Sequence, residues 1–189
     1  DARSTQYKSD HFDVIVVGAG HAGIEAAMAA AKMGAKTALF TIKLEAVGRM
    51  SCNPTVGGPA KGHLAREIDA LGGQIGYVAD LTGIHFRMLN KKKGPAVWAP
   101  RTQNDRQIYS LEMRDIVEKQ DNLELIESSI AELIAEPCHD SKIYEIRGVR
   151  SQLGKAYFAP KVIMANGTFL KGKIHVGSVS FPGGRSGEP

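Results

Sequence analysis

A short apolar run followed at once by closely spaced glycines is the feature that most constrains the fold of this chain. Residues 12–17, FDVIVV, are typical of a buried β-strand, because β-branched side chains dominate the run. The segment GAGHAG over residues 18–23 comes next and has the spacing G-x-G-x-x-G. Residues 24–33 favour a helix and residues 36–41 a second strand. The order predicts a βαβ unit and therefore an α/β fold with a parallel sheet.

The glycines of this segment have separate roles in such a turn. Gly18 permits the tight turn, Gly20 lets the backbone approach a pyrophosphate, and Gly23 lets the helix pack close to the strand. The amino end of the helix offers N–H groups and a partial positive charge to the phosphates. We therefore predict a dinucleotide site formed by Gly18, Ala19, Gly20, His21, Ala22 and Gly23. We expect the His21 ring to cap the helix or to face solvent.

The second strand does not distinguish FAD from NAD, because its end lacks the acidic residue that usually binds a ribose hydroxyl. Thr41-Ile42-Lys43 stands at that point, and the nearest acid is Glu45. We expect Thr41 to bond a ribose and Lys43 to lie near a phosphate.

Later segments favour FAD. Residues 129–135 and 143–149 are typical of a small antiparallel sheet with a turn over 137–142. A buried strand over 161–165 then ends in Asn166-Gly167-Thr168. This order is that of a Rossmann-like FAD-binding domain of the glutathione-reductase type, with an inserted small antiparallel sheet. Gly167 and Thr168 would approach the cofactor, and Ile130 would contact the adenine.

Composition excludes several classes of protein. Hydrophobic residues make up 43% of the chain and charged residues 23%, which is ordinary for a globular protein and argues against disorder. No uncharged apolar stretch is long enough to span a membrane, because Glu25 and Lys32 interrupt the best candidate. Two cysteines are too few for a disulfide framework and suggest a reducing compartment. We predict no metal site, no membrane association and a cytoplasmic location.

Glycine is the unusual component, with 21 residues, of which nine lie between Gly48 and Gly94. Such a stretch is either a linker or a backbone that approaches a ligand closely. Within it, Cys52 and Asn53 stand in the segment MSCNPTVGG, and Gly57 and Gly58 end that segment. A thiol here either performs chemistry or is an ordinary loop residue.

A basic segment follows, from residue 85 to residue 106. It carries six lysines and arginines and a single acid, Asp105, so it either contacts phosphates or forms a solvated surface. The candidate nucleic-acid contacts are Lys91, Lys92, Lys93, Arg101 and Arg106. We also predict an amphipathic helix over 102–120, with Thr102 as its cap and with Ile108, Leu111, Ile116 and Val117 on its apolar face.

Three blocks together carry a family resemblance. They are GAGHAG over 18–23, MSCNPTVGG with KGHL over 50–64, and GPAVWAPRTQNDR over 94–106; GTFLKGKIH over 167–175 extends the match. Residues 12–189 resemble the amino-terminal part of the MnmG (GidA) family of FAD-dependent tRNA-modifying enzymes. The second and third blocks are the specific ones, because they are not general features of flavoproteins.

The resemblance implies a function. Family members work with a partner GTPase, MnmE, and add a carboxymethylaminomethyl or aminomethyl group to carbon five of the wobble uridine of certain tRNAs. Reduced FAD, regenerated by NADH, and methylenetetrahydrofolate are the implied redox and carbon sources, and family members are homodimers. Cys52 would be a thiol near the flavin and the uridine, while Asn53, Gly57 and Gly58 would lie against the flavin.

Two further expectations complete the sequence-based interpretation. We expect a disordered lead over residues 1–11 and an incomplete FAD-binding domain over 12–189, cut from a longer protein and inactive alone. The alternative function is an NADH-dependent flavin oxidoreductase that acts on a small molecule or a disulfide. That class needs a redox partner for Cys52, and the sequence shows none nearby. A non-catalytic nucleotide-binding module that uses its basic loop for RNA is the third possibility.

Overall fold

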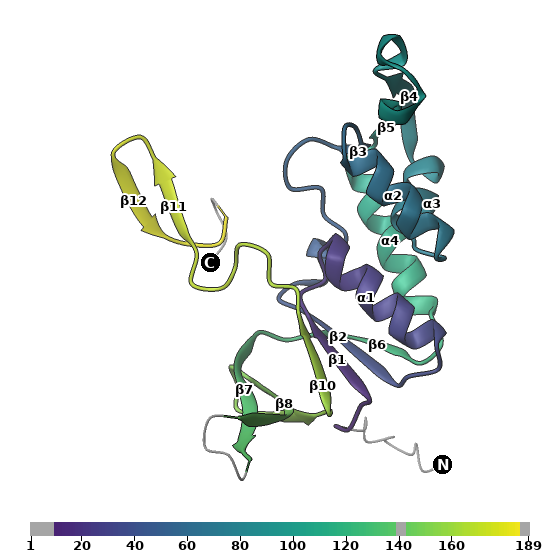
Figure 1. Ribbon diagram of the computed structural model, residues 1–189. Coiled ribbons are helices and arrows are strands. Elements are labelled where there is room, and N and C mark those ends of the chain that lie inside the picture. Colours follow the sequence, from purple (N-terminus) through teal and green to yellow (C-terminus); the bar gives the residue numbers. More distant parts are fainter. Residues whose placement is uncertain (1–9, 139–142, 186–189) are drawn as a thin grey trace, which may run out of the picture.

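A four-stranded parallel sheet forms the centre of the structure, a computed structural model that describes residues 10–138 and 143–185 (Figure 1). The strand order is β10, β1, β2, β6, and every neighbouring pair is parallel. The strands are β1 (Val14–Val17), β2 (Thr37–Thr41), β6 (Leu123–Glu127) and β10 (Lys161–Met164). This arrangement confirms the predicted α/β fold and its first βαβ unit.

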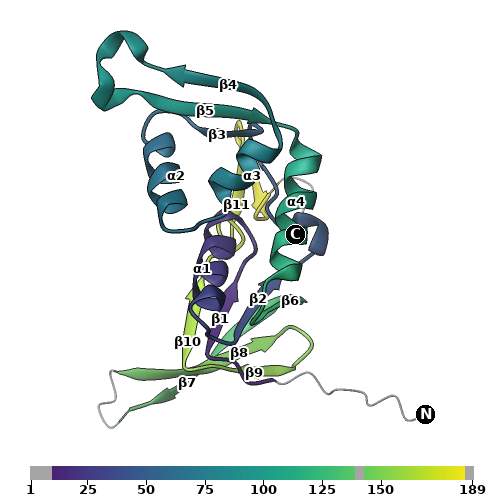
Figure 2. The ribbon, with the colours of Figure 1, turned by 90° about the vertical axis from the view of Figure 1, so that its right-hand side faces the viewer.

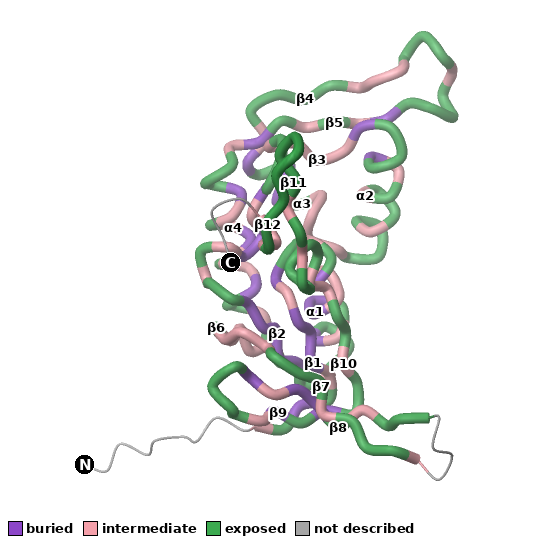
Figure 3. The backbone as a smooth tube through the Cα atoms, turned by 90° about the vertical axis from the view of Figure 1, so that its left-hand side faces the viewer, coloured by how far each residue is buried: buried purple, intermediate pink, exposed green. Residues whose placement is uncertain are grey.

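The central strands β1 and β2 of the parallel sheet are buried on both faces, which explains why residues 14–17, VIVV, are all apolar. Val16 and Leu39 point into one core with α1 (His21–Lys32) and α4 (Arg106–Lys119). Their neighbours Ile15 and Phe40 point into a second core on the opposite face. Figure 3 shows this buried centre, with exposed backbone around it.

The second core lies against the predicted inserted sheet, which is antiparallel and has the order β7, β8, β9. Its strands are β7 (Ile130–Pro137), β8 (Tyr144–Ser151) and β9 (Ala156–Phe158). They fall between β6 and β10 in the chain, so the prediction of an insertion is confirmed. The turn expected over 137–142 lies largely outside the described residues.

A third sheet stands at the other end of the molecule, with the strand order β3, β5, β4. It consists of β3 (Thr55–Gly57), β4 (Gly83–Leu89) and β5 (Ala99–Asn104). The helices α2 (Lys61–Ala70) and α3 (Ile75–Leu81) lie along one of its faces (Figure 2). Short 3₁₀ turns connect these elements: η1 (Leu44–Ala46), η2 (Lys91–Lys93) and η3 (Pro95–Val97).

The helix predicted over 102–120 begins four residues later than expected, so that prediction is wrong at its amino end. Asp105 is the cap, and its carboxylate accepts the N–H groups of Gln107 and Ile108 at 2.9 Å. The predicted apolar face is also wrong in part, because Ile108 and Leu111 are exposed. The buried side chains of α4 are Tyr109, Met113 and Val117.

Two segments near the chain ends differ from expectation. Asp10 and His11 pair with Phe158 of β9, so the disordered lead predicted over 1–11 is wrong for these two residues, and its remainder lies outside the described residues. A hairpin that we did not predict follows β10, with β11 (Lys173–Val176) paired to β12 (Val179–Pro182). None of the helices in the described part of the chain is long and apolar enough to cross a membrane.

Candidate cofactor cradle and cysteine loop

Residues 18–23, here called the phosphate loop, have the backbone that the glycine spacing predicts. Gly18 has φ +107°, and it occupies the tight turn after β1. A Cβ on Gly23 would lie 1.7 Å from the carbonyl oxygen of Gly18, so only glycine allows α1 to pack this close. A Cβ on Gly20 would instead meet nothing within 4 Å, so this backbone faces open space. The three glycines therefore fit a loop that a pyrophosphate approaches from the Gly20 side.

The turn after β10 lies directly beside the phosphate loop. The N–H of Ala165 donates to the carbonyl of Val17 at 2.8 Å, and a Cβ on Gly18 would lie 2.4 Å from the carbonyl oxygen of Ala165. Gly167 follows with φ +57° and open space at its Cβ position, and Thr168 is exposed. The structure thus brings together two segments that we assigned to the cofactor and that lie far apart in the sequence.

His21 does not lie as we expected, because its ring neither caps α1 nor faces solvent. No side chain caps this helix, and Nδ1 of His21 is buried without a hydrogen-bond partner among the described residues. The ring packs edge-on against Tyr109 of α4, with 5.6 Å between the ring centroids. Burial lowers the pKa of His21 and raises that of Tyr109, for which the nearby Glu25 carboxylate is a further cause. The lowered pKa of His21 favours the uncharged imidazole at neutral pH.

At the end of β2, where we expected a ribose to bind, the contacts differ from those that we predicted. Thr41 is buried, and its hydroxyl donates to the carbonyl of Lys43 at 2.9 Å. The carboxylate at this edge comes from Glu127 on the adjacent strand, and it accepts the N–H of Leu44 at 2.8 Å. Ile130 begins β7 and is half-buried against the second core. The assignments of Thr41 and Ile130 to the cofactor stay predictions.

Residues 47–54, here called the cysteine loop, are held in place at both ends. The N–H of Gly48 donates to the carbonyl of Ala19 in the phosphate loop at 3.0 Å. At the other end, the N–H of Asn104 donates to the carbonyl of Pro54 at 2.7 Å. The side chains of Val47 and Met50 are buried in the first core. The loop is therefore no flexible linker, and it lies next to the phosphate loop.

Two arginines from distant parts of the chain bind the centre of the cysteine loop. Arg106, the first residue of α4, donates from Nη2 to the carbonyl of Cys52 at 2.7 Å. Arg185 donates to the carbonyl of Ser51 at 3.3 Å. The side chains of Cys52 and Asn53 are exposed, so the thiol is accessible while its backbone is fixed. Arg106, which we assigned to nucleic acid, is thus placed to position Cys52.

The glycines after the cysteine loop pack inside the chain. A Cβ on Gly57 would lie 2.1 Å from the carbonyl oxygen of Pro100, and one on Gly62 would lie 2.7 Å from the same atom. Gly58 donates its N–H to that carbonyl at 2.8 Å, has φ +95°, and has open space at its Cβ position. Close packing of β3 and α2 against β5 therefore explains Gly57 and Gly62. Of the three, Gly58 keeps space for a ligand beside it.

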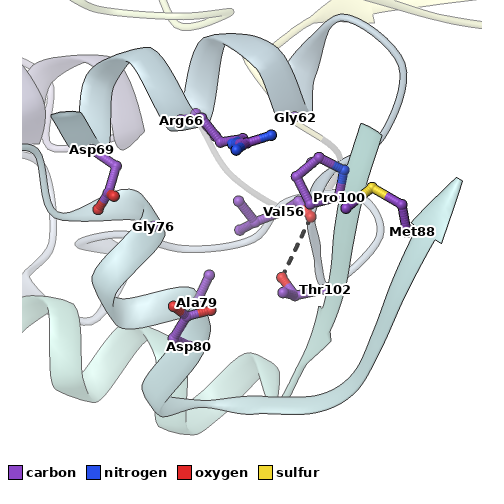
Figure 4. Close-up of a pocket in the computed structure, with 12 residues that line it drawn as sticks. Val56, Gly62, Arg66, Asp69, Gly76, Ala79, Asp80, Met88, Pro100 and Thr102 are labelled. Atoms are coloured by element: carbon purple, nitrogen blue, oxygen red, sulfur yellow. Dashed lines mark hydrogen bonds between the residues drawn. The ribbon is translucent and has the colours of Figure 1, made fainter. Parts of the chain in front are cut away.

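A cleft of about 260 Å³ lies between the third sheet and the helices α2 and α3 (Figure 4). Its apolar lining includes Val56, Met88 and Pro100, while Arg66 and Asp69 line it from α2. Thr102 donates to the carbonyl of Val56 across the strands of the cleft wall. None of the residues that we assigned to nucleic acid or to catalysis lines this cleft.

The basic segment forms a projecting hairpin of β4 and β5, with Lys91, Lys92 and Lys93 exposed at its tip (Figure 2). Arg101 is exposed on β5, at a distance from the tip along the strand. The structure therefore spreads these five basic candidates over three places: the tip, the sheet and the first turn of α4. In the described parts of the chain, no group of three or more His, Cys, Asp or Glu side chains could hold a metal ion.

Sequence reasoning missed two residues that organise this region. Glu25 on α1 accepts the N–H groups of Gln74 and Ile75, at 2.9 and 2.7 Å, and so caps α3 from another helix. Tyr109 is fully buried behind His21. A lone glutamate within an alanine-rich helix was the available signal for Glu25, since a carboxylate on the packed side of a helix needs donors.

The parallel sheet, the glycine turn and the uncapped amino end of α1 place the chain in the class of Rossmann-like α/β proteins that bind dinucleotides. The chain belongs to the family of glucose inhibited division protein A (GidA), whose family model matches residues 13–189. A solved structure of GidA from Aquifex aeolicus is 49% identical and superposes with a TM-score of 0.87. It matches 95% of this chain, which covers 29% of that protein.

Curated relatives agree with this family. The chain is 53% identical over 182 residues to a protein of Thermodesulfovibrio yellowstonii named tRNA uridine 5-carboxymethylaminomethyl modification enzyme MnmG. A protein of Salinibacter ruber with the same name is 52% identical over 181 residues. These alignments cover 96% and 95% of this chain, which spans 28% and 27% of the two relatives.

Proposed function

We propose that the chain is the FAD-binding part of an enzyme that modifies carbon five of the wobble uridine in tRNA. The observation that carries the proposal is the 53% identity to a relative named for this modification, over an alignment that covers 96% of the chain. The product would carry a carboxymethylaminomethyl or aminomethyl group. NADH and methylenetetrahydrofolate would be the co-substrates.

The residues of the cradle fit FAD. The open side of Gly20 and the amino end of α1 would take the pyrophosphate, and the turn at Gly167 and Thr168 would lie beside it. The His21 ring packs against Tyr109 and does not cap the helix, so no side-chain cap competes for the N–H groups at the helix end. Bound flavin would supply hydride transfer, and this chain would supply binding and orientation.

Cys52 would be the nucleophile of this chain. Its thiolate would attack carbon six of the uridine ring, forming an S–C bond while the ring electron pair moves onto carbon five. Carbon five would then attack the methylene carbon carried by the folate. Loss of the proton on carbon five would expel the folate nitrogen, the amine of the product would add to the methylene carbon, and departure of the thiolate would restore the ring double bond. The hydrogen bond from Arg106 to the Cys52 carbonyl fixes the backbone from which the thiol projects.

The name of these relatives supports tRNA as the substrate, and the family resemblance implies the other partners. We propose tRNA as the substrate, the GTPase MnmE as the partner, a homodimer as the assembly and the cytoplasm as the location. The exposed lysines at the tip of the β4–β5 hairpin would contact phosphates of the tRNA. This contact is independent of base sequence, so it would strengthen binding without selecting the tRNA.

The flavin disulfide reductase alternative lacks support in the described residues. Both cysteines are free; Cys138 directly follows β7 of the inserted sheet, whereas Cys52 precedes β3 of the third sheet. A redox pair within the chain would need these two sulfurs in contact.

Analysis of tRNA nucleosides by mass spectrometry tests the proposal. A strain without the gene should lack the modified wobble uridine, and the full-length protein should restore it and should purify with bound FAD. Unchanged modified uridine in the deletion strain would refute the proposed function.

A further inference from the structure

Two arginines stand directly opposite each other on adjacent strands of the third sheet. Arg87 of β4 pairs in register with Arg101 of β5. The Cβ atoms of such cross-strand neighbours are about 5 Å apart, and like charges at this spacing repel each other. Both side chains are exposed, and neither has a hydrogen bond or ion pair to any of the described residues. The pair therefore stands without an internal counter-charge.

The two arginines project from the face that the helices leave open. Side chains alternate between the faces of a sheet, and Val56, Met88, Pro100 and Thr102 line the cleft beneath α2 and α3. Arg87 and Arg101 are the odd-numbered neighbours of these residues, so they lie on the other face. None of the described helices covers that face in Figure 2.

This face has no negative side chain. The strands β3, β4 and β5 contain neither Asp nor Glu, and the whole span 83–104 has none. One row of side chains across the face is Thr55, Gln103 and His85, and the next row contains Arg101 and Arg87. The lysines of the tip lie beyond the arginine row. The surface therefore combines hydrogen-bond donors with uncompensated positive charge.

The face begins at the cysteine loop. Thr55 follows Asn53 by two positions, and Gly57, which pairs with Arg101, lies five positions after Cys52. An extended chain of that length spans at most about 18 Å. Arg101 therefore lies within this distance, plus one strand spacing, of Cys52, and Arg87 lies one strand spacing further. A short stretch of polynucleotide backbone covers such a distance.

From this geometry and on the basis of the proposed function, we infer that Arg87 and Arg101 form a clamp for one phosphate of the substrate RNA. The phosphate lies between the two guanidinium groups, each of which presents paired N–H donors that match phosphate oxygens. Its charge removes the repulsion between the arginines, and its place in the RNA backbone directs the adjacent nucleotides toward Cys52. Bases are not read here, because the face offers contacts to the backbone.

The proposed clamp predicts opposite effects of the same substitutions in the absence and in the presence of RNA. A purely structural role of the two arginines would not predict this. Without RNA, replacing one arginine relieves a like-charge contact, so Arg87→Gln and Arg101→Gln should each raise the unfolding temperature. With RNA, each variant should bind more weakly, and the slope of log affinity against log salt should fall by about 0.7 per lost phosphate of a single strand. Because both arginines hold one phosphate, the double variant should lose less than the sum of the single losses.

The test uses the full-length protein with bound FAD, and its ligands are the substrate tRNA, inorganic phosphate and polyglutamate. Lys161→Gln is the control, because it removes one exposed positive charge on β10, at the other end of the structure. Arg87→Lys and Arg101→Lys keep the charge but lose the paired donors, so they should retain the salt slope while binding more weakly.

Three outcomes would overturn the clamp. Equal affinity and slope in wild type and in Arg87→Gln/Arg101→Gln would do so, provided that wild type binds and modifies tRNA. Polyglutamate binding that is as tight as tRNA binding and equally sensitive to both variants would assign the face to an acidic protein. If the Lys161→Gln control loses as much affinity for tRNA as the arginine variants, the effect depends on net charge and not on the clamp. A wild-type protein that holds FAD but neither binds nor modifies tRNA would instead refute the proposed function.

Discussion

The guanidinium group of Arg106 donates a hydrogen bond to the backbone carbonyl of Cys52 at 2.7 Å, across 54 positions of the sequence. It joins the first turn of α4 to the centre of the cysteine loop. The thiol itself is exposed, so this bond restrains the backbone and leaves the sulfur accessible. Cys52 therefore combines an accessible thiol with a restrained backbone. A reacting residue needs both, because the attacking atom must be reachable and held in position.

Arg106→Gln should loosen that support. A hydrogen bond to a charged group contributes about 1.5–3 kcal/mol, and the exposed position of Arg106 favours the lower value, which corresponds to roughly tenfold in activity. We expect about tenfold slower tRNA modification and faster alkylation of Cys52 by a maleimide, with FAD content unchanged. Cys138→Ser in the background removes the other thiol from the alkylation assay. Equal alkylation rates in the two proteins would contradict the restraint.

Gly20→Ala and Gly23→Ala should fail in different ways. The Cβ at residue 23 would overlap the Gly18 carbonyl, so Gly23→Ala should destabilise the fold by about 1–3 kcal/mol, as overpacking does. The Cβ at residue 20 points into open space, so Gly20→Ala should cost about 1 kcal/mol or less and lose FAD. Flavin absorbance and urea unfolding of both proteins check this contrast. Full FAD content in Gly20→Ala would show that the pyrophosphate does not bind on that side of the loop.

Glu25→Ala should destabilise the contact between α1 and α3. Its carboxylate accepts two backbone N–H groups at the start of α3, and loss of such a cap costs about 0.5–2 kcal/mol. Glu25→Gln keeps one acceptor oxygen and should lose less. Glu67→Ala removes an exposed carboxylate of α2 that has no hydrogen bond to the described residues, and it is the control. Equal unfolding free energies for the Glu25 and Glu67 variants would show that the cap contributes nothing.

His21 should make the protein less stable in mild acid. Burial lowers its pKa in the folded state, so the unfolded chain binds the proton first as the pH falls below the ordinary value near 6.5. Stability is therefore fully present above that pH and declines below it, by at most about 1.4 kcal/mol per pH unit until the folded pKa is reached. His21→Gln lacks this dependence. Unfolding temperatures from pH 7.5 to 5.0 should diverge between the two proteins, and parallel curves would place the ring in solvent.

Regular local patterns made the parallel sheet predictable. The FDVIVV run, the glycine turn and the alanine-rich helix each require one conformation, and together they fix β1, α1 and β2. The beginning of α4 was less clear, because Thr102 and Asp105 both suit a helix cap. Thr102 is part of a strand, because residues 99–104 pair with β3 and β4. The apolar face of α4 depended on what packs against it, which the sequence of the helix does not contain.

The site was predictable where backbone conformation alone defines it. Gly18 and Gly23 have the turn and packing roles that their spacing indicated, and the open space beside Gly20 suits the pyrophosphate contact that stays a prediction. The surroundings of Cys52 were not, since Ala19, Asn104, Arg106 and Arg185 come from separate segments and meet only in the folded chain. Gly57 and Gly62 show the same limit, because the Pro100 carbonyl that requires them lies on another strand.

Cys52→Ser should abolish tRNA modification while leaving the cofactor in place. The two residues differ by one atom, and the exposed side chain makes no packing contact that the cores depend on, so the fold and the FAD content should not change. A serine hydroxyl is a far weaker nucleophile than a thiolate at neutral pH, and we expect a loss of about 100-fold or more, since removing a nucleophile costs at least that much. Cys138→Ser, at the end of β7, is the matched control and should keep full activity. Nucleoside mass spectrometry of tRNA treated with each protein measures the difference, and full activity in Cys52→Ser would reduce this thiol to an ordinary loop residue.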